Sequence, residues 1–180
     1  MEVGQMLLAL CFSSCVLLAC AAVGAGDVPQ SAPFINTWLV AGTFDNDEQN
    51  TGYEQDWIDE KRVQPREGLA SAGKSWMYFD DRLFSRNYDD YQDLFSYFKI
   101  KRNESVAAKV AYAHVYVHSP EAQEAQLRIG ADNEFKAWLN GSLVASSTQT
   151  GAYRDSVKAQ VSLHAGWNRL LLKIGNQENG

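Results

Sequence analysis

Cysteine is missing from nearly the whole chain. The three cysteines of the 180 residues, Cys11, Cys15 and Cys20, all lie near the N-terminus, so the remainder has no disulfide and no thiol nucleophile. The G-x-S-x-G, H-E-x-x-H and G-x-x-x-x-G-K-[ST] motifs are absent as well. A carboxylate pair for glycoside hydrolysis requires only proximity in space, and an acid-rich chain always offers one. The sequence therefore favours a protein that is not an enzyme.

Positive charge is also scarce. Lys and Arg number 16 against 22 Asp and Glu, which gives a net charge of -6 and a pI near 5.0. A nucleic-acid partner would require a basic patch over its phosphates, and the sequence has no cluster of Lys or Arg. Aromatic residues make up 12% of the chain, and Trp and Tyr combine a flat apolar ring with a polar group. The composition excludes nucleic acid and permits sugar binding.

The N-terminus carries an apolar run, residues 6–23, followed by small residues and then by Asp27. This pattern predicts a secretory leader over residues 1–26. A linker with two prolines follows at 27–33, and residues 34–180 form one folded module of ordinary domain size.

Two other fates of the leader stay open. Leu17-Leu18-Ala19-Cys20 resembles a bacterial lipobox, in which Cys20 would carry lipid. The five residues before the apolar run contain no Lys or Arg, so an uncleaved anchor helix is a further alternative. All three alternatives place the module outside the cytoplasm, secreted or on the cell surface, and the membrane is reached only through a lipid anchor or an uncleaved leader.

Two stretches near the C-terminus, 126–144 and 157–174, alternate apolar and polar residues with the period of a half-buried strand. The first predicts a hairpin whose turn is Asn140-Gly141, because both central positions of a type I′ turn need φ > 0. The second predicts a pair of strands joined at Ala165-Gly166. The apolar positions are Leu127, Ile129, Phe135, Ala137, Leu139, Val157, Ala159, Val161, Leu163, Leu170, Leu172 and Ile174.

Further strands are expected at 34–44 and 106–118, the latter ended by Pro120. Residues 45–59 are polar and irregular, which predicts a long loop, and long loops in compact domains tend to be functional. The fold class is therefore all-β, an antiparallel β-sandwich.

At WLVAGTF, RIGADNEFKAWLNGSLV and LHAGWNRLLLKI the chain resembles the galactose-binding-like jelly-roll modules appended to secreted bacterial polysaccharide-degrading enzymes and surface proteins. The resemblance spans roughly residues 35–175. It implies a jelly roll of the carbohydrate-binding-module type and a neighbouring catalytic domain in a longer chain. Complete modules of this family continue with another strand after LLLKI, so the resemblance also predicts that a last strand is lacking here.

Ring side chains supply the candidates for a glycan site. The segment AYAHVYVH places Tyr112, His114, Tyr116 and His118 on one strand face. This row either stacks on sugar or packs beneath the long loop. The candidate carbohydrate-binding residues are Tyr53, Trp57, Trp76, Tyr112, His114, Tyr116 and Trp138, whereas Trp38 and Trp167 are expected to be structural.

Candidate calcium ligands lie in the acidic loop and in two further acidic pairs, Asp80-Asp81 and Asp89-Asp90. Asp45 and Asp47 are the first candidates for a structural Ca²⁺, which takes six to eight oxygen ligands, although acidic loops of an acidic protein are often just solvated. No other cofactor is expected. His114 and His118 would stand roughly 13 Å apart along a strand, too far to share one ion.

The sequence thus predicts a non-catalytic, extracytoplasmic module that binds a polysaccharide or cell-surface glycan. The alternative is a structural spacer or docking domain of a secreted polysaccharide-degrading enzyme, without a glycan site of its own.

Overall fold

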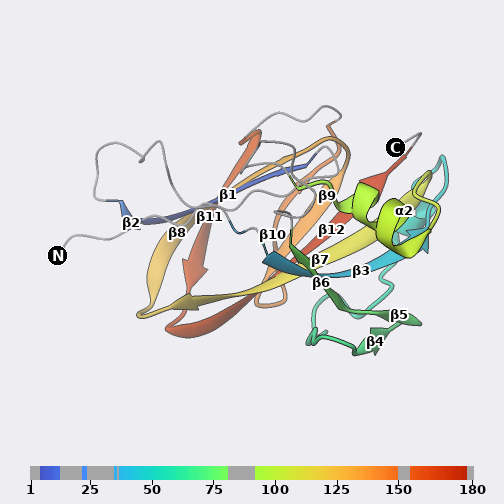
Figure 1. The fold of residues 1–180 in the computed structure, drawn as a ribbon. Coiled ribbons are helices and arrows are strands. Elements are labelled where there is room, and N and C mark those ends of the chain that lie inside the picture. Colours follow the sequence, from blue (N-terminus) through green and yellow to red (C-terminus); the bar gives the residue numbers. More distant parts are fainter. Residues whose placement is uncertain are drawn as a thin grey trace.

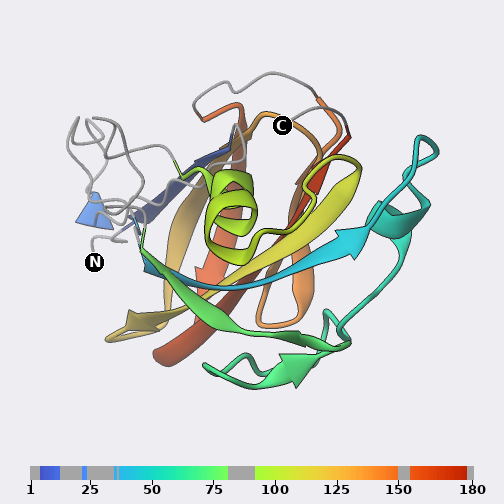
Figure 2. The same ribbon diagram turned by 45° about the vertical axis from the view of Figure 1, so that its right-hand side comes forward.

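A computed structural model describes residues 5–12, 22–23, 35, 37–80, 92–149 and 155–177. In this part of the chain, strands form one six-stranded and one four-stranded sheet (Figures 1 and 2). The six-stranded sheet has the order β10-β9-β12-β7-β3-β6. Its strands are β3 (Thr37–Asp45), β6 (Met77–Asp80), β7 (Lys109–Ser119), β9 (Phe135–Leu139), β10 (Ser142–Ser147) and β12 (Gly166–Asn176).

The four-stranded sheet has the order β11-β8-β1-β2. Its strands are β1 (Gln5–Phe12), β2 (Ala22–Val23), β8 (Gln123–Ala131) and β11 (Val157–Leu163). The strand pairs of both sheets are antiparallel except β1 and β8, which run parallel. The antiparallel β-sandwich expected from the alternation is confirmed.

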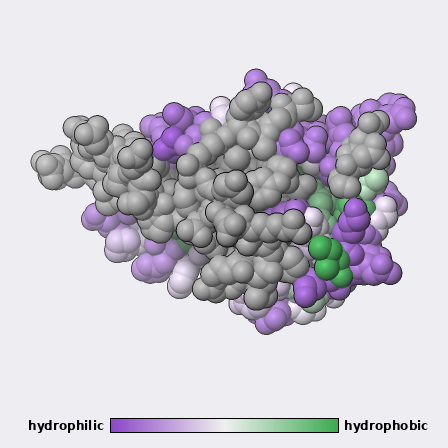
Figure 3. All heavy atoms as spheres, turned by 45° about the horizontal axis from the view of Figure 1, so that its top comes forward, coloured by the Kyte–Doolittle hydropathy of each residue, from purple (hydrophilic) through white to green (hydrophobic). Residues whose placement is uncertain are grey.

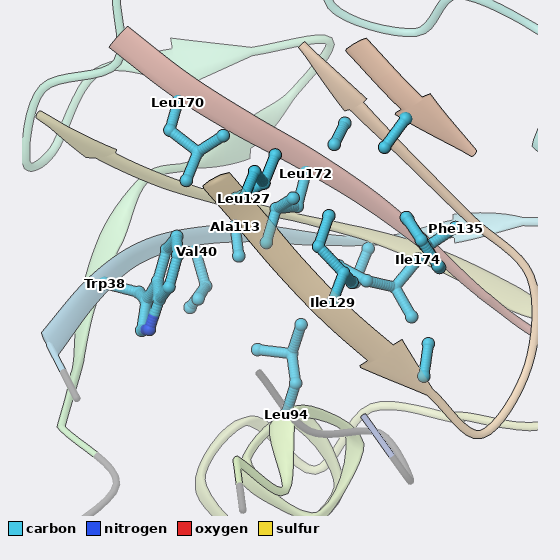
Figure 4. Close-up of a cluster of buried hydrophobic side chains, with 14 of the residues drawn as sticks. Trp38, Val40, Leu94, Ala113, Leu127, Ile129, Phe135, Leu170, Leu172 and Ile174 are labelled. Carbon is cyan, nitrogen blue, oxygen red and sulfur yellow. The ribbon is translucent and has the colours of Figure 1, made fainter. Parts of the chain in front are cut away.

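The main core lies between the two sheets (Figure 4). Leu127 and Ile129 of β8 face Leu170, Leu172 and Ile174 of β12, and all five are 0–1% exposed. Helix α2 (Leu94–Arg102) adds Leu94 and three other buried side chains to the same cluster. Every alternating apolar residue predicted to face inward either belongs to this core or packs against it.

The predicted hairpin is present. Asn140 and Gly141 have φ values of 52° and 86°, and β9 and β10 pair on either side of them. A Cβ at Gly141 would stand 2.5 Å from the carbonyl oxygen of Lys61, so glycine is required here for space as well as for φ.

We expect Gly141→Val to lower the free energy of unfolding by about 2 kcal/mol or more, because a β-branched residue resists positive φ and its Cβ would overlap a backbone oxygen. Urea unfolding measures the loss. The exposed Ser142→Val on the adjoining strand is the control. Equal stability of Gly141→Val and wild type would contradict this account of the turn.

The predicted pairing of the two C-terminal strands is wrong. β11 pairs with β8 in the four-stranded sheet, whereas β12 pairs with β7 and β9 in the six-stranded sheet. The turn before β12, where Gly166 has φ 93°, carries the chain from one sheet to the other. Asn168 holds this turn through hydrogen bonds with the backbone of His164. Leu170–Ile174 thus has ladder partners on both sides.

The loop expected at 45–59 contains one helical turn, α1 (Thr51–Glu54). The Oδ1 of Asp47 accepts a hydrogen bond from the backbone N–H of Thr51 at 2.8 Å, which satisfies a donor at the start of the turn. The chain then forms a small hairpin, β4 (Ala70–Ser71) and β5 (Lys74–Ser75), which projects away from β8 and β11 in Figures 1 and 2.

No helix in the described ranges has the length and hydropathy required to cross a bilayer. The division at residues 26 and 33 stays a prediction, and Cys20, Asp81, Asp89 and Asp90 lie outside the described residues.

Candidate functional site

Part of the outer face of the six-stranded sheet is covered by residues 46–76, which we call the covering segment. Beneath it lies a second apolar cluster, the outer cluster, which comprises Leu39, Ala41, Phe44, Tyr53, Ile58, Trp76, Val110, Tyr112, Trp138 and Leu171. Trp57 and Val63 pack against it while remaining partly exposed. The covering segment, which includes the loop expected to be functional, therefore buries a hydrophobic layer of the sheet.

Most of the nominated sugar-stacking residues lie in or beside this layer. Tyr53, Trp76, Tyr112, His114 and Trp138 are between 0% and 5% exposed. Of the two interpretations given to the ring row of β7, packing beneath the loop describes Tyr112 and His114. Trp57 is half-buried and Tyr116 is 38% exposed, so these two nominated rings are the ones a ligand could reach.

Two basic residues of β12 fasten the covering segment to the sheet. The buried Lys173 ammonium donates to the Gln55 carbonyl at 2.5 Å and to Glu60 Oε1 at 2.8 Å. Glu60 Oε1 also accepts from the Tyr112 hydroxyl at 2.7 Å.

Arg169 lies four residues before Lys173, on the same face of β12. Its guanidinium donates to the carbonyls of Val63 and Lys61 at 2.6 Å each and to the Glu60 carbonyl at 3.3 Å. Burial lowers the pKa of both basic groups. The sequence analysis did not identify Arg169 and Lys173. Their pattern, two basic residues four positions apart on the outer side of an apolar strand, indicates partners elsewhere in the chain. The acidic residues available for such pairing are Asp56, Asp59 and Glu60.

At one edge of the covering segment is an open cleft of about 400 Å³, which we call the Trp57 cleft. Four chain segments converge there: the end of β3, the covering segment, the loop after α2 and the start of β7. Its lining is Thr43, Phe44, Asp45, Trp57, Ala72, Lys74, Glu104, Ser105 and Lys109. Its volume is within the range of small-molecule sites, about 300–1,000 Å³.

The indole of Trp57 is held in a fixed orientation. It stacks on Phe44 with ring centroids 5.3 Å apart and an interplanar angle of 26°, and its Nε1–H donates to the Gly52 carbonyl at 2.8 Å. A Cβ on Gly52 would stand 1.9 Å from the Asp45 carbonyl oxygen, so only glycine lets the helical turn approach β3 this closely. The ring is therefore pre-positioned in the cleft wall.

Glu104 is the fixed carboxylate of the cleft. Its Oε2 accepts hydrogen bonds from the Thr43 backbone N–H at 2.7 Å and from the Thr43 hydroxyl at 3.1 Å. Lys74 approaches the same oxygen at 3.4 Å, and Arg102 stands 3.4 Å from Oε1. Glu104 lies in a short loop after a helix, and nothing in its local pattern marked it.

Asp45 and Asp47, the proposed calcium ligands, are engaged by protein donors. Asp45 pairs with Lys109, whose hydrogen bond and charge lower the pKa of that carboxyl. Asp47 accepts from the backbone and hydroxyl of Thr51. Within the described ranges, no three His, Cys, Asp or Glu side chains gather as a metal site would require. Calcium, which takes six to eight oxygens, would have to displace these donors, so the fit is poor.

Trp167 departs from its expected structural role. It lies at the start of β12 and is 65% exposed. Its ring meets that of His118 edge-on, with the ring centroids 4.9 Å apart. Together with Tyr116 these residues form a small exposed aromatic area, which we call the Trp167 patch. In the view of Figure 3, the described surface is mostly hydrophilic, and hydrophobic side chains form only small areas.

Comparison with known proteins assigns the chain to no family. No family model and no curated protein matches the chain. Solved structures of the β-glucuronidase from Ruminococcus gnavus are similar to it. The complex with D-glucaro 1,5-lactone has a TM-score of 0.43 and 15% identity, over 80% of this chain and 21% of that chain.

Another crystal structure of that β-glucuronidase has a TM-score of 0.43 and 14% identity, over 79% of this chain and 21% of that one. This chain therefore spans about a fifth of the length of these neighbours. At such identity and TM-score, the likeness assigns neither a ligand nor an activity.

Proposed function

We propose that this protein is a non-catalytic, extracytoplasmic carbohydrate-binding module and that the Trp57 cleft is its glycan site. The observation that carries the proposal is the arrangement of one half-buried indole, backed by Phe44, beside charged hydrogen-bonding groups in an open cleft. The apolar CH face of a sugar packs on such a ring, while its hydroxyls need donors and acceptors at the ring's edge.

Rigidity supports a binding role. The indole is fixed by stacking and by a backbone hydrogen bond, and Glu104 is fixed by Thr43. Groups that are already immobile lose little further conformational entropy when a ligand arrives, which favours affinity. A sugar would replace water at the exposed polar groups of the cleft, and such an exchange conserves most of their hydrogen bonds.

A structural spacer is the second candidate. The specific observation that favours it is the burial of five of the seven nominated residues, which removes most of the expected aromatic row from contact with a ligand. A spacer would retain the fold and the covering segment and would show no affinity for any glycan.

Retention on a polysaccharide panel, measured by affinity electrophoresis, separates the two functions. We expect the wild type to be retained by at least one polysaccharide and Trp57→Ala to bind about tenfold more weakly or worse, because the stacking surface is lost. Trp167→Ala removes an exposed indole elsewhere and should bind within about twofold of wild type. Melting curves establish that both variants are folded.

Three other outcomes have definite meanings. Absence of retention on every polysaccharide would favour the spacer. Equal losses in the two variants would place the site outside the cleft. If the wild type were retained without EDTA and not retained with it, glycan binding would require calcium. Asp45 and Asp47 would then be the first residues to replace.

A further inference from the structure

The charged groups of the Trp57 cleft differ in how many of their hydrogen bonds are already made within the protein. The Glu104 carboxylate is surrounded by donors: the Thr43 N–H and hydroxyl and the Lys74 ammonium at Oε2, and Arg102 beside Oε1. A carboxylate offers about four lone-pair positions. Glu104 therefore has little acceptor capacity left for a ligand.

The two ammonium groups have donors to spare. Each lysine ammonium carries three N–H groups, and the described residues supply one side-chain acceptor to each: Glu104 for Lys74, and Asp45 for Lys109. The distance from Lys74 Nζ to Glu104 Oε2 is long, at 3.4 Å, and the Lys74 side chain is 35% exposed. The Asp45 side chain is 84% exposed, and an exposed ion pair contributes little, so a ligand could share or replace it.

We infer that the cleft prefers a sugar with a carboxylate, so that the module binds uronic-acid polysaccharides. This inference rests on the proposed glycan function of the same cleft. Lys74, Lys109 and Trp57 line one cavity: the ring carries the apolar face of the sugar, and the two ammonium groups donate to its carboxylate. Hydrogen bonds between charged partners are roughly twice as strong as neutral ones.

The overall charge does not oppose this preference at working salt. The chain carries a net charge of -6, but charges farther than about 10 Å are largely screened at 0.1 M salt. The local field at the cleft is set by its own four charged side chains, Asp45, Lys74, Glu104 and Lys109, and by the neighbouring Arg102. Two of the lining groups are cations, two are anions, and Arg102 adds a further positive charge.

Matched acid and ester polysaccharides test the preference. Polygalacturonate is compared with its methyl ester, and alginate with its propylene glycol ester, by affinity electrophoresis in 0.1 M salt and EDTA, so that calcium cannot bridge the chains. We expect the wild type to bind at least one acid form about tenfold more tightly than its ester, because the ester removes the charge and keeps the sugar ring.

Three variants locate the effect. Lys74→Met and Lys109→Met should each lower the affinity for the acid form to about that for the ester. Lys158→Met makes the same charge change at an exposed position of β11 in the other sheet and should keep the preference. Two lysine variants are used so that one misfolded protein does not decide the test.

The outcomes separate this inference from the function on which it rests. Retention of neutral or esterified glycans without a preference for the acid overturns the inference and leaves the glycan function standing. Retention of no glycan at all overturns both. An equal loss in Lys158→Met attributes the preference to net charge and also overturns the inference.

Discussion

Replacing Lys173 with methionine is expected to lower the free energy of unfolding by about 3–5 kcal/mol, the usual result of removing one partner from a buried ion pair. Lys173 is 0% exposed, and Glu60 is 8% exposed. Without the ammonium, the Glu60 carboxylate would keep the Tyr112 hydroxyl and lose its counter-charge. The Gln55 carbonyl would lose its donor as well. Urea unfolding followed by tryptophan fluorescence measures the loss.

Two controls make this result specific. Arg62 and Asp59 form an exposed pair at 3.8 Å in the same segment, so Arg62→Met should cost less than about 1 kcal/mol. The double variant Lys173→Met/Glu60→Leu should recover most of the loss, since an apolar pair can replace a buried ionic one. A cost below about 1 kcal/mol for Lys173→Met alone would mean that water screens the pair and that it does not fasten the covering segment.

The second large effect is a dependence of stability on pH through His114. This side chain is 1% exposed, its Nδ1 lies 3.0 Å from the Leu170 carbonyl oxygen, and it meets the rings of Trp76 and Tyr116 edge-on. Burial lowers its pKa from 6.5 to about 4, the Leu170 carbonyl opposes this shift, and the charge of Arg169 adds to it. Between about pH 4 and pH 6.5, therefore, the imidazole is neutral in the folded protein and protonated in the unfolded chain.

The direction of the effect follows from that lowered pKa. Above pH 6.5 both states are neutral and His114 adds no pH dependence. As the pH falls below 6.5, the unfolded chain takes up a proton that the folded protein refuses, so stability falls until the folded pKa is reached. A shift of this size corresponds to about 3 kcal/mol lost by pH 4.

His114→Gln isolates this contribution from that of the carboxylates. Unfolding free energies of wild type and variant are measured between pH 7 and pH 4, and their difference is plotted against pH. We expect the difference to change by about 3 kcal/mol over that range, with the variant losing less stability on acidification. Parallel pH profiles would show that His114 titrates alike in both states and would contradict its burial.

The sequence predicted local geometry well, because each such prediction used a period or a turn. Alternation placed Leu127 and Phe135 inward, and Asn140-Gly141 placed the hairpin, as the structure has them. Alternation says nothing about which sheet a strand joins. β11 and β12 follow each other and face one core, yet they lie in opposite sheets, because partner choice depends on contacts distant in sequence.

The outer face was harder to predict for the same reason. Residues such as Trp138 and Lys173 occupy the polar side of their strands by period, and only the covering segment, more than 60 positions earlier in the chain, buries them. That burial depends on Lys173 reaching Gln55 and Glu60 across 118 and 113 positions. The Trp57 cleft likewise combines two separate stretches of the chain, 43–74 and 104–109, so Trp57 could be nominated as an aromatic residue of the loop and Glu104 could not.

The indole N–H resonances give the most direct test of the proposed function. The chain has five tryptophans, so a ¹H–¹⁵N spectrum contains five indole signals, which single Trp→Phe variants assign. On titration with the oligosaccharide of the best-retained polysaccharide, we predict the largest shift at Trp57 and little change at the buried Trp38 and Trp76. A largest shift at Trp167, or no shift at saturating sugar, would contradict the assignment of glycan binding to the Trp57 cleft.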